Sequence, residues 1–293
     1  KYKISWPELS PAIIRAQMIK DEKLFKDLDL SSLRMICTGG EPWTEKPWKW
    51  LFQVIGKSKV PIMNSAGGTE VSGSILHCCL HRPFKVGSFN APIPGMSADI
   101  LNLDGQKVST NEMGELVMRK SSIGLTKSLW NDDKRYIDNY WSVIKDYWVH
   151  GDLASRDADG HWYLHGRSDD TIKVSGKRIG PSELESVIVK SGKAKEVAAV
   201  GIPDANKGSK IILSIVPAEN NDQKESFFED LVIKDLGKSF KPDKVIFVKD
   251  LPKTRNMKIM RRVIKSCLAN QDPGDLSTLL NPESVEEIRS HAI

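Results

Sequence analysis

Apolar positions along the first third of the chain change between helical and strand spacing. Over residues 10–28 they recur at roughly helical intervals, and a short apolar strand is expected over residues 33–37. An aromatic-rich amphipathic helix is predicted over residues 45–55, and residues 60–63 begin another strand. Each predicted strand runs into a Gly-rich turn. This rhythm is typical of a doubly wound α/β sheet, in which ligands bind at the carboxyl ends of the strands.

The pattern changes to short apolar runs separated by turns over residues 85–120, which predicts a small β-barrel or curled sheet. A short helix follows over residues 132–141. The tryptophans of this region, Trp130, Trp141 and Trp148, are expected to lie in the core.

Turns and charges are most concentrated over residues 147–185. Residues 149–152 predict a strand that ends in a Gly turn and presents Asp152, whose ionised carboxylate can accept two O–H bonds from a sugar diol. Residues 157–160 contain the Asp-Gly signal of a hairpin. Gly176-Lys177-Arg178 offers bare backbone and a guanidinium to an anion. Singly, each piece is an ordinary turn or a solvated charge; their order and spacing argue against that interpretation.

The remaining residues predict a small α+β domain. A helix is expected from Pro181 to Gly192, with Ser182 and Glu185 at the spacing of a capping box. The further elements expected are strands over residues 197–202, 211–216 and 245–248, a helix over residues 227–236, and the start of a terminal helix at residues 281–285.

Length and composition favour a folded protein of two domains. The 293 residues are 40% hydrophobic and 28% charged. No apolar run approaches a membrane span and no signal peptide is recognisable, so no membrane span is expected. The four cysteines lack zinc-ligand spacing; Cys78 and Cys79 beside His77 and His81 are better explained by an apolar strand than by a metal site. Reduced thiols and a cytoplasmic location are therefore expected.

The net charge of +5 is unevenly distributed. Residues 171–270 contain 20 Lys and Arg against 12 Asp and Glu. Such an excess is typical of a protein that binds nucleic acid or a polyphosphate ligand. No sequence motif of a nucleic-acid-binding fold is present, so a nucleotide such as ATP or coenzyme A is preferred over nucleic acid.

Taken together, residues 147–185 resemble the hinge region of the AMP-forming adenylating enzymes, and within them the acetyl-CoA and medium-chain acyl-CoA synthetases. The resemblance covers nearly the whole chain. It implies an α/β fold: part of a doubly wound α/β subdomain over residues 1–84, a β-rich subdomain over residues 85–168, and a small mobile α+β domain over residues 169–293.

The resemblance implies nucleotide-binding residues in the larger domain. The segment Gly40-Glu41-Pro42 is similar to the one that lies against adenine, and Asn64 falls where the family contacts the adenine amino group. Thr69 and Glu70 resemble a Thr-Glu pair whose hydroxyl bonds the α-phosphate and whose carboxylate binds Mg²⁺.

Further roles follow from the hinge and the C-terminal domain. Asp152 is implied to bind the ribose hydroxyls, and Arg167 to assist at the ribose or phosphate. Asp169 is the implied hinge, Gly176 lines the route of the coenzyme A thiol, and Arg178 approaches the phosphate. The run from Leu251 to Arg262 resembles the catalytic-lysine loop and assigns Lys258, although Asn256-Met257 replaces the usual Ser-Gly, so that the loop is stiffer.

One position differs in a way that concerns the substrate. Acetate-specific relatives have a Trp three residues before the motif Glu, and Gly67 stands there in this chain. A missing indole implies an acid larger than acetate, of medium length or branched, unless another large side chain fills the acyl pocket.

The implied function is that of an AMP-forming acyl-CoA synthetase, which uses ATP, Mg²⁺ and coenzyme A with a small carboxylate; a homo-oligomer is compatible with this. No Ser/Thr/Gly-rich phosphate loop is present and the first strands of the large domain are missing, so the chain is expected to be part of a longer enzyme and inactive alone. Acetyl-CoA synthetase proper, an enzyme that loads a carrier-protein thiol, and a non-catalytic adenylate-binding fragment remain alternatives.

Overall fold

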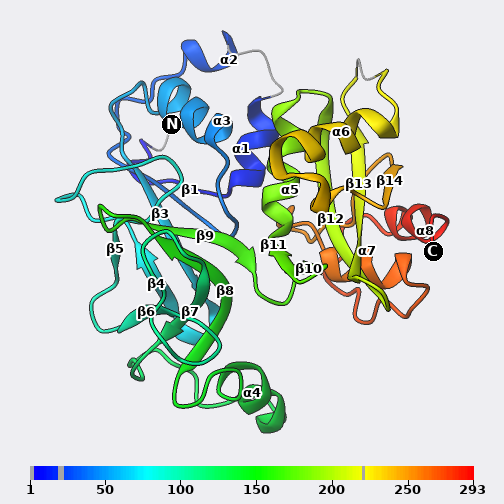
Figure 1. The fold of residues 1–293 in the computed structure, drawn as a ribbon. Coiled ribbons are helices and arrows are strands. Elements are labelled where there is room, and N and C mark those ends of the chain that lie inside the picture. The colour runs from blue at the N-terminus through cyan, green and yellow to red at the C-terminus, as the bar shows by residue number, and fades with distance from the viewer. Residues whose placement is uncertain (1–2, 19–22, 220–221) are drawn as a thin grey trace. The chain divides into compact units, whose positions relative to one another are not determined.

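The computed structural model describes residues 3–18, 23–219 and 222–293 (Figure 1). It divides into two compact units, Lys1–Ser168 and Asp169–Ile293. Each unit has hydrophobic clusters of its own. None of the helices in the described part of the chain combines the length and the hydropathy that a membrane span requires.

The first unit begins with a five-stranded sheet in the order β1-β2-β3-β4-β5. Its first three strands are parallel and its last two pairs antiparallel. The parallel strands alternate with helices, as expected for part of a doubly wound fold. The elements are β1 (Glu8–Leu9), α1 (Pro11–Met18), α2 (Lys23–Lys26), β2 (Ile36–Gly39), α3 (Glu45–Trp50), the π-helical turn η1 (Leu51–Ile55), β3 (Ile62–Gly68), the 3-10 turn η2 (Thr69–Val71), β4 (Gly73–His77) and β5 (Ala91–Pro92).

Two differences from the predicted elements have local causes. The helix expected over residues 10–28 appears as α1 and α2, and residues 19–22 lie outside the described residues. The strand expected over residues 33–37 is shifted to Ile36–Gly39, because the parallel pairing with β3 begins at Ile36. Cys78 is buried just after β4, and not within a strand.

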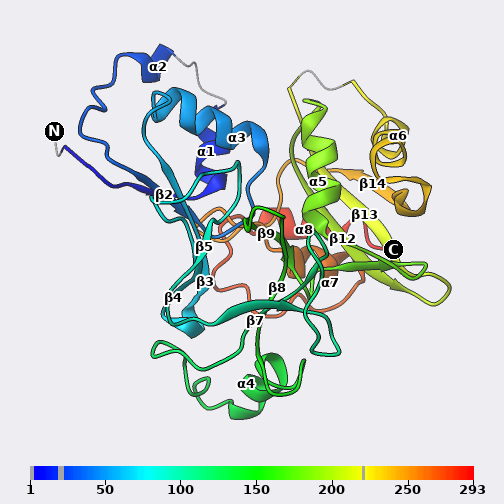
Figure 2. The same ribbon diagram turned by 60° about the vertical axis from the view of Figure 1, so that its left-hand side comes forward.

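A second, antiparallel sheet in the order β6-β7-β8-β9 forms the predicted β-rich part, and α4 packs at one end of β8 (Figures 1 and 2). Trp148 is buried in its core, as predicted, but Trp130 is 92% exposed, so the prediction for Trp130 was wrong. Trp130 lies in the turn before α4, where its side chain meets no sheet. The elements are β6 (Ala98–Leu101), β7 (Gly114–Met118), α4 (Asp133–Tyr140), β8 (Trp148–Arg156) and β9 (Trp162–Arg167).

The second unit contains the hairpin β10-β11 and a three-stranded sheet in the order β12-β13-β14. Figures 1 and 2 show that α5 and α6 cover one face of that sheet and α7 and α8 the other. The elements are β10 (Ile172–Val174), β11 (Lys177–Ile179), α5 (Pro181–Lys190), β12 (Ala194–Asp204), β13 (Gly208–Pro217), α6 (Glu225–Leu236), the 3-10 turn η3 (Lys238–Phe240), β14 (Lys244–Phe247), α7 (Arg261–Leu268) and α8 (Glu283–Arg289).

The sequence of β12 explains this three-layer packing. Successive strand residues point to opposite faces, and here both sets are apolar. Val197 and Ala199 pack with α5 and α6, whereas Ala198 and Val200 pack with α7 and α8. The sheet is therefore buried on both sides.

Helix α5 begins at Pro181 as predicted, but its capping partners differ. The Glu183 carboxylate accepts a hydrogen bond from the Gly180 amide at 3.0 Å, so the predicted capping role of Ser182 and Glu185 was wrong. Glu185 instead forms a bidentate ion pair with Arg261 at 2.7 and 2.9 Å. It is drawn away from the helix end because that guanidinium lies on the neighbouring α7.

Candidate active site

The segment predicted to lie against adenine follows β2. Gly40 has a φ of +96°, a left-handed conformation that favours glycine. The Glu41 carboxylate is held by the Arg15 guanidinium of α1 at 2.9 Å. Pro42 follows directly and is half-buried. The turn thus has a fixed shape at the carboxyl end of a parallel strand, which is where such sheets bind ligands.

Asn64, predicted to contact the adenine amino group, serves the fold. Its side-chain oxygen accepts from the Thr38 hydroxyl at 3.2 Å, and its amide donates to the Gly87 carbonyl at 3.3 Å. The residue is 2% exposed. Because both ends are engaged and little surface is accessible, this geometry argues against a direct contact between Asn64 and a nucleotide.

Thr69 and Glu70 lie in the 3-10 turn that follows β3. Thr69 is exposed, and Glu70 is half-buried. One carboxylate oxygen of Glu70, Oε1, accepts a hydrogen bond from the Tyr140 hydroxyl at 2.9 Å. A Cβ placed on Gly68 would lie 3.0 Å from the other oxygen, Oε2, and 3.2 Å from Cε1 of His150. The Glu70 carboxylate and the His150 ring therefore both lie next to the bare backbone of Gly68.

A bulge in β8 presents the predicted ribose ligand. Between the pairs Glu115–Leu153 and Val117–Val149 the register shifts, so that β8 contains extra residues around Gly151. Gly151 has a φ of +81°, and the strand continues beyond it to Arg156. The prediction that the strand ends at Asp152 was therefore wrong. Bulges of this kind re-aim side chains next to active sites.

Asp152 and Arg167 are brought together beside this bulge. The Arg167 guanidinium donates to the His150 carbonyl at 3.0 Å and lies 3.5 Å from the Asp152 carboxylate. A Cβ on Gly151 would approach that guanidinium to 2.6 Å, so the bare glycine makes room for it. On the other side, Nε2 of His150 lies 3.3 Å from Oδ2 of Asp152. The carboxylate is thus oriented from two sides.

Three aromatic or imidazole side chains join this site without having been predicted as functional. Tyr140 stacks on Trp148 with 5.2 Å between ring centroids and 7° between planes, and Trp148 lies 5.6 Å from the His150 ring. Burial, followed by the hydrogen bond to Glu70, raises the pKa of Tyr140 to about 12. The sequence signal was the helical spacing of Tyr136 and Tyr140, which alone indicates only a packed face.

The groups around Glu70 supply only part of what a magnesium ion needs. Within the described residues, no group of three or more His, Cys, Asp and Glu side chains could hold a metal by itself. Mg²⁺ is commonly held by one or two carboxylates together with substrate phosphates. Glu70, with one oxygen held by Tyr140 and the other over Gly68, fits a cation that arrives with a nucleotide.

The predicted acyl-pocket position, Gly67, is exposed, but the backbone of β4 blocks the direction in which a side chain would point. A Cβ there would lie 2.0 Å from the Gly73 carbonyl oxygen and 2.6 Å from the Ser74 Cα, both in β4. The space next to Gly67 that a larger side chain would enter is therefore filled by the neighbouring strand. The absence of an indole does not by itself leave a cavity at this point.

Three of the predicted residues of the second unit lie at its surface near the β10-β11 hairpin. Ser175 and Gly176 form the tip, with φ values of +49° and +80°, as a two-residue hairpin turn requires. Arg178 is exposed on β11, and Asp169 is the exposed first residue of the unit.

Lys258 closes a small loop. Its amide donates to the Thr254 hydroxyl at 3.2 Å, its carbonyl accepts from the Thr254 amide at 2.9 Å, and its side chain is exposed. Met257, which stands where the family usually has Gly, has a φ of +64°. Below the loop, Lys253 is 5% exposed and paired with Glu196 and Asp250. The loop therefore presents the exposed ammonium of Lys258 and is anchored by the buried ion pairs of Lys253.

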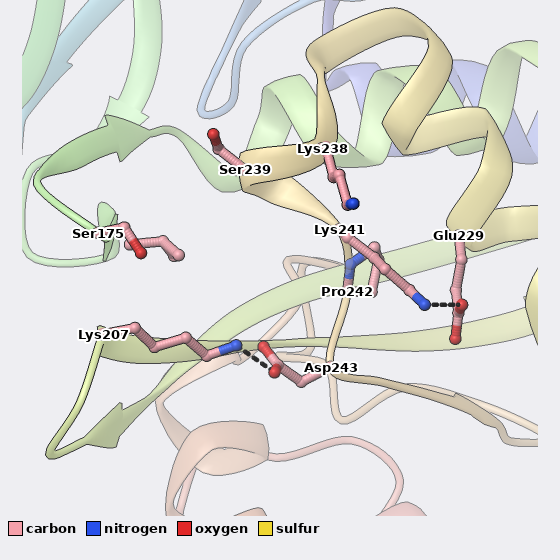
Figure 3. Close-up of a pocket in the computed structure, with 9 residues that line it drawn as sticks. Ser175, Lys207, Glu229, Lys238, Ser239, Lys241, Pro242 and Asp243 are labelled. Atoms are coloured by element: carbon pink, nitrogen blue, oxygen red, sulfur yellow. Dashed lines mark hydrogen bonds and ion pairs between the residues drawn. The ribbon is translucent and has the colours of Figure 1, made fainter.

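A pocket of about 430 Å³ lies in the second unit, beside the β10-β11 hairpin (Figure 3). Figure 3 shows Ser175 and Lys207 on one side of it and Lys238 and Lys241 on the other. Lys207 pairs with Asp243, and Lys241 with Glu229 at 2.9 Å. Within the described part of the chain, the Lys238 ammonium has no hydrogen-bonding or ionic partner. None of the predicted site residues lines the pocket, although Ser175 precedes Gly176.

Comparisons with known proteins identify the family of this chain. Residues 1–130 match the family model described as AMP-binding enzyme, and residues 183–258 match the one described as AMP-binding enzyme C-terminal domain. The acetyl-coenzyme A synthetase of Pasteurella multocida is 35% identical over 300 residues, which are 99% of this chain and 46% of that protein. The acetyl-coenzyme A synthetase of Methanothrix soehngenii is also 35% identical, over 98% of this chain and 44% of that protein.

Among solved structures, the acetoacetyl-CoA synthetase from Streptomyces lividans aligns with a TM-score of 0.83 and 22% identity, over 98% of this chain and 45% of that one. It supports the fold. The chain spans about half the length of the curated relatives that it matches. With the two family models and the curated relatives in agreement, the chain belongs to the AMP-binding enzyme family.

Proposed function

We propose that this chain carries part of the catalytic machinery of an AMP-forming acyl-CoA ligase. The observation that supports this most directly is the meeting of Glu70, Asp152 and Arg167 in one unit, around His150 and Tyr140. Glu70 offers a carboxylate to a cation, Asp152 a carboxylate to a diol, and Arg167 a guanidinium to an anion. A magnesium nucleotide requires all three.

In the first half-reaction, a carboxylate oxygen of the acid attacks the α-phosphorus of ATP, and pyrophosphate leaves. Asp152 is proposed to accept hydrogen bonds from the ribose hydroxyls, held in place by His150 and Arg167. Thr69, exposed at the end of β3, is proposed to donate to the α-phosphate. A cation at Glu70 would offset the phosphate charge. Because negative charge develops on phosphate oxygens, fixed donors and cations nearby lower the barrier.

Lys258 and Arg178 are the proposed cationic residues of the second unit. Both side chains are exposed, as a group that meets a substrate needs to be. In the second half-reaction, the thiol sulfur of coenzyme A attacks the acyl carbon and AMP leaves. We assign Asp169 as the hinge and Gly176 as part of the thiol's route. The pocket beside Ser175, where Lys238 has no partner among the described residues, suits the phosphates of coenzyme A.

The size of the carboxylic acid substrate is a separate question. Gly67 favoured an acid larger than acetate, whereas the backbone of Gly73 fills the space directly beside it. A larger acid would therefore have to use other space in the complete enzyme. The carboxylate series described next decides between acetate and longer acids.

The test is ATP–pyrophosphate exchange across carboxylates from acetate to medium-chain acids. It compares this chain with a chimera in which the chain replaces the matching part of the Pasteurella multocida relative. We expect exchange from the chimera and its loss in the Lys258→Ala variant. Lys265→Ala, an exposed lysine on α7, is the matched control and should retain exchange.

Two results would contradict the proposal. No exchange with any acid, from a chimera that folds and binds AMP, would favour a non-catalytic adenylate-binding module. Equal exchange in the Lys258→Ala variant and in the parent would remove Lys258 from the adenylation step.

A further inference from the structure

Helix α4 holds Glu70 at two points. At the side chain, the Tyr140 hydroxyl donates to Oε1 at 2.9 Å. At the backbone, the Thr126 amide donates to the Glu70 carbonyl at 2.7 Å, and the Tyr136 hydroxyl in turn donates to the Thr126 carbonyl at 2.6 Å. Tyr136 and Tyr140 lie one turn apart on α4, with 5.5 Å between ring centroids. The two tyrosines therefore fix both the backbone and the carboxylate of Glu70.

Tyr140 is itself held on its other face. Its ring stacks on Trp148, which is 1% exposed and lies two residues before His150 on β8. The same strand bears Asp152 at its bulge. A single phenol ring is thus packed between the proposed cation ligand and the strand of the proposed ribose ligand. Rotation of Tyr140 away from Glu70 would break this stack.

We propose that Tyr140 is a positioning residue that holds one oxygen of Glu70, so that the other is aimed at the cation of the bound nucleotide. This inference rests on the proposed function. A free glutamate side chain samples many rotamers, and fixing it before binding removes that entropic cost from the binding step. Carboxylates that bind metals are themselves commonly oriented by hydrogen bonds from neighbouring groups.

The chemistry of the donor suits this role. A phenol donates one hydrogen bond, here to Oε1, and does not offset the negative charge of the carboxylate as a lysine or arginine in its place would. Glu70 thus keeps its full charge for the cation.

The experiment measures Mn²⁺ binding to this chain by electron paramagnetic resonance of the free ion, in the presence of AMP. Tyr140→Phe removes the hydroxyl and keeps the ring stack. Tyr163→Phe is the matched control, because its hydroxyl bonds the Asp157 carboxylate at 3.3 Å, in the β8-β9 hairpin. Urea unfolding and AMP affinity without metal are measured for each variant.

We expect Tyr140→Phe to weaken Mn²⁺ binding about tenfold, the lower end of the effect of removing a group that orients a metal ligand. Its AMP affinity without metal and its urea midpoint should stay close to the parent's, and Tyr163→Phe should bind Mn²⁺ as the parent does. Glu70→Gln should abolish Mn²⁺ binding, so that the signal of the free ion keeps its full amplitude. Should Tyr140→Phe fail to fold, Trp148→Phe, which reduces the stacking ring, should weaken Mn²⁺ binding by a smaller factor.

Unchanged Mn²⁺ affinity in Tyr140→Phe would overturn the proposal, as would an equal loss of AMP affinity without metal, which indicates a general structural role. A parent chain that binds AMP but no Mn²⁺ would overturn it while leaving the nucleotide function standing. A parent chain that binds neither would overturn both.

Discussion

The ammonium of Lys253 lies 2.6 Å from the carboxylate of Glu196, although the two residues belong to a loop and a strand far apart in the sequence. A second carboxylate, Asp250, lies 2.5 Å away. Lys253 is 5% exposed, and its backbone amide donates a hydrogen bond to the side-chain oxygen of Asn281 at 3.0 Å. These buried contacts of Lys253 anchor the loop of Lys258.

Replacement of Lys253 should therefore destabilise the second unit. Lys253→Met keeps the apolar stem and removes two hydrogen bonds to charged groups, each worth about 1.5–3 kcal/mol where buried. Because the carboxylates can rehydrate in part, we expect a net loss of about 2 kcal/mol in the free energy of unfolding, measured in urea. Lys249→Met, at an exposed position, is the control and should change it by less than about 0.5 kcal/mol. Equal stabilities would refute the anchoring role.

The same pair predicts a pH dependence. Burial raises the pKa of Asp250, but the Lys253 ammonium together with hydrogen bonds from the Leu251 amide and the Asn281 side chain outweighs it, and the pKa lies below its ordinary value of 3.8. Burial lowers the pKa of Lys253, but the hydrogen bonds to Asp250 and Glu196 outweigh it, and the pKa lies above 10.5. Because the carboxyl pKa is lowered in the folded state, Asp250 stabilises the fold above pH 3.8, and this stabilisation is lost on acidification. Because the lysine pKa is raised, Lys253 stabilises the fold below pH 10.5, and this stabilisation is lost at higher pH.

Urea midpoints of the second unit should therefore form a plateau between these limits and fall on either side. In Lys253→Met the fall at acid pH should be smaller, because Asp250 has lost its partner. An identical acid limb in the parent and the variant would show that other carboxylates control it.

The loop of Lys258 contains a strained residue. Met257 has a φ of +64°, a region that costs a residue with a Cβ about 1–2 kcal/mol and costs glycine nothing. Met257→Gly should unfold at the same or a higher urea concentration than the parent, and Met257→Val at a lower one, because β-branched residues avoid this region most strongly. A valine variant as stable as the glycine variant would disprove this ranking.

Gly67 should not accept a side chain. A Cβ there would lie 2.0 Å from a backbone oxygen of β4, so Gly67→Ala should separate the β3-β4 pair and destabilise the first unit by about 1–3 kcal/mol, measured by urea unfolding. Gly160→Ala is the control for the cost of backbone conformation alone, because Gly160 has a φ of +84° and open space where a Cβ would lie. It should cost about 1 kcal/mol. A harmless Gly67→Ala would mean that the hairpin yields readily and that an indole could be accommodated.

Trp130 and Trp148 should behave oppositely. Trp130 is 92% exposed and Trp148 is 1% exposed. Trp130→Phe should leave the free energy of unfolding within about 0.5 kcal/mol of the parent and reduce the quenching of the fluorescence by iodide, of which Trp6, 61% exposed, should retain a part. Trp148→Phe should lower stability by more than 1 kcal/mol, roughly as expected for a smaller ring in a close-packed core. Iodide quenching that is undiminished in the Trp130→Phe variant would contradict the exposure of Trp130.

Elements with strong local signals were predicted well. The helix at residues 45–55 is observed as α3 and η1, the hairpin turn at residues 157–160 joins β8 to β9, and α5 starts at Pro181. In each case the decisive features are close in sequence: apolar periodicity, an Asp-Gly pair, or a proline that fits the first helical turn. The family motifs were recognised in the same way, because their residues are adjacent.

The errors concern features that depend on distant partners. The strand through Asp152 continues because β7 and β9 pair with it on both sides, although Gly151 looked like its end. Glu185 does not cap its helix because its carboxylate forms an ion pair with Arg261. Trp130 was assigned to the core by residue type, yet no element covers it.

The sequence alone determined the order of elements, the turns and the motif residues, since these depend on backbone preferences of neighbouring residues. Only the tertiary structure decided which groups meet: Tyr140 with Glu70, 70 positions apart, His150 with Asp152 at a bulge, and Gly67 with the backbone of β4. Such contacts depend on strand register and on packing between elements, where a shift of one residue turns a side chain to the opposite face. Local preferences do not specify that register.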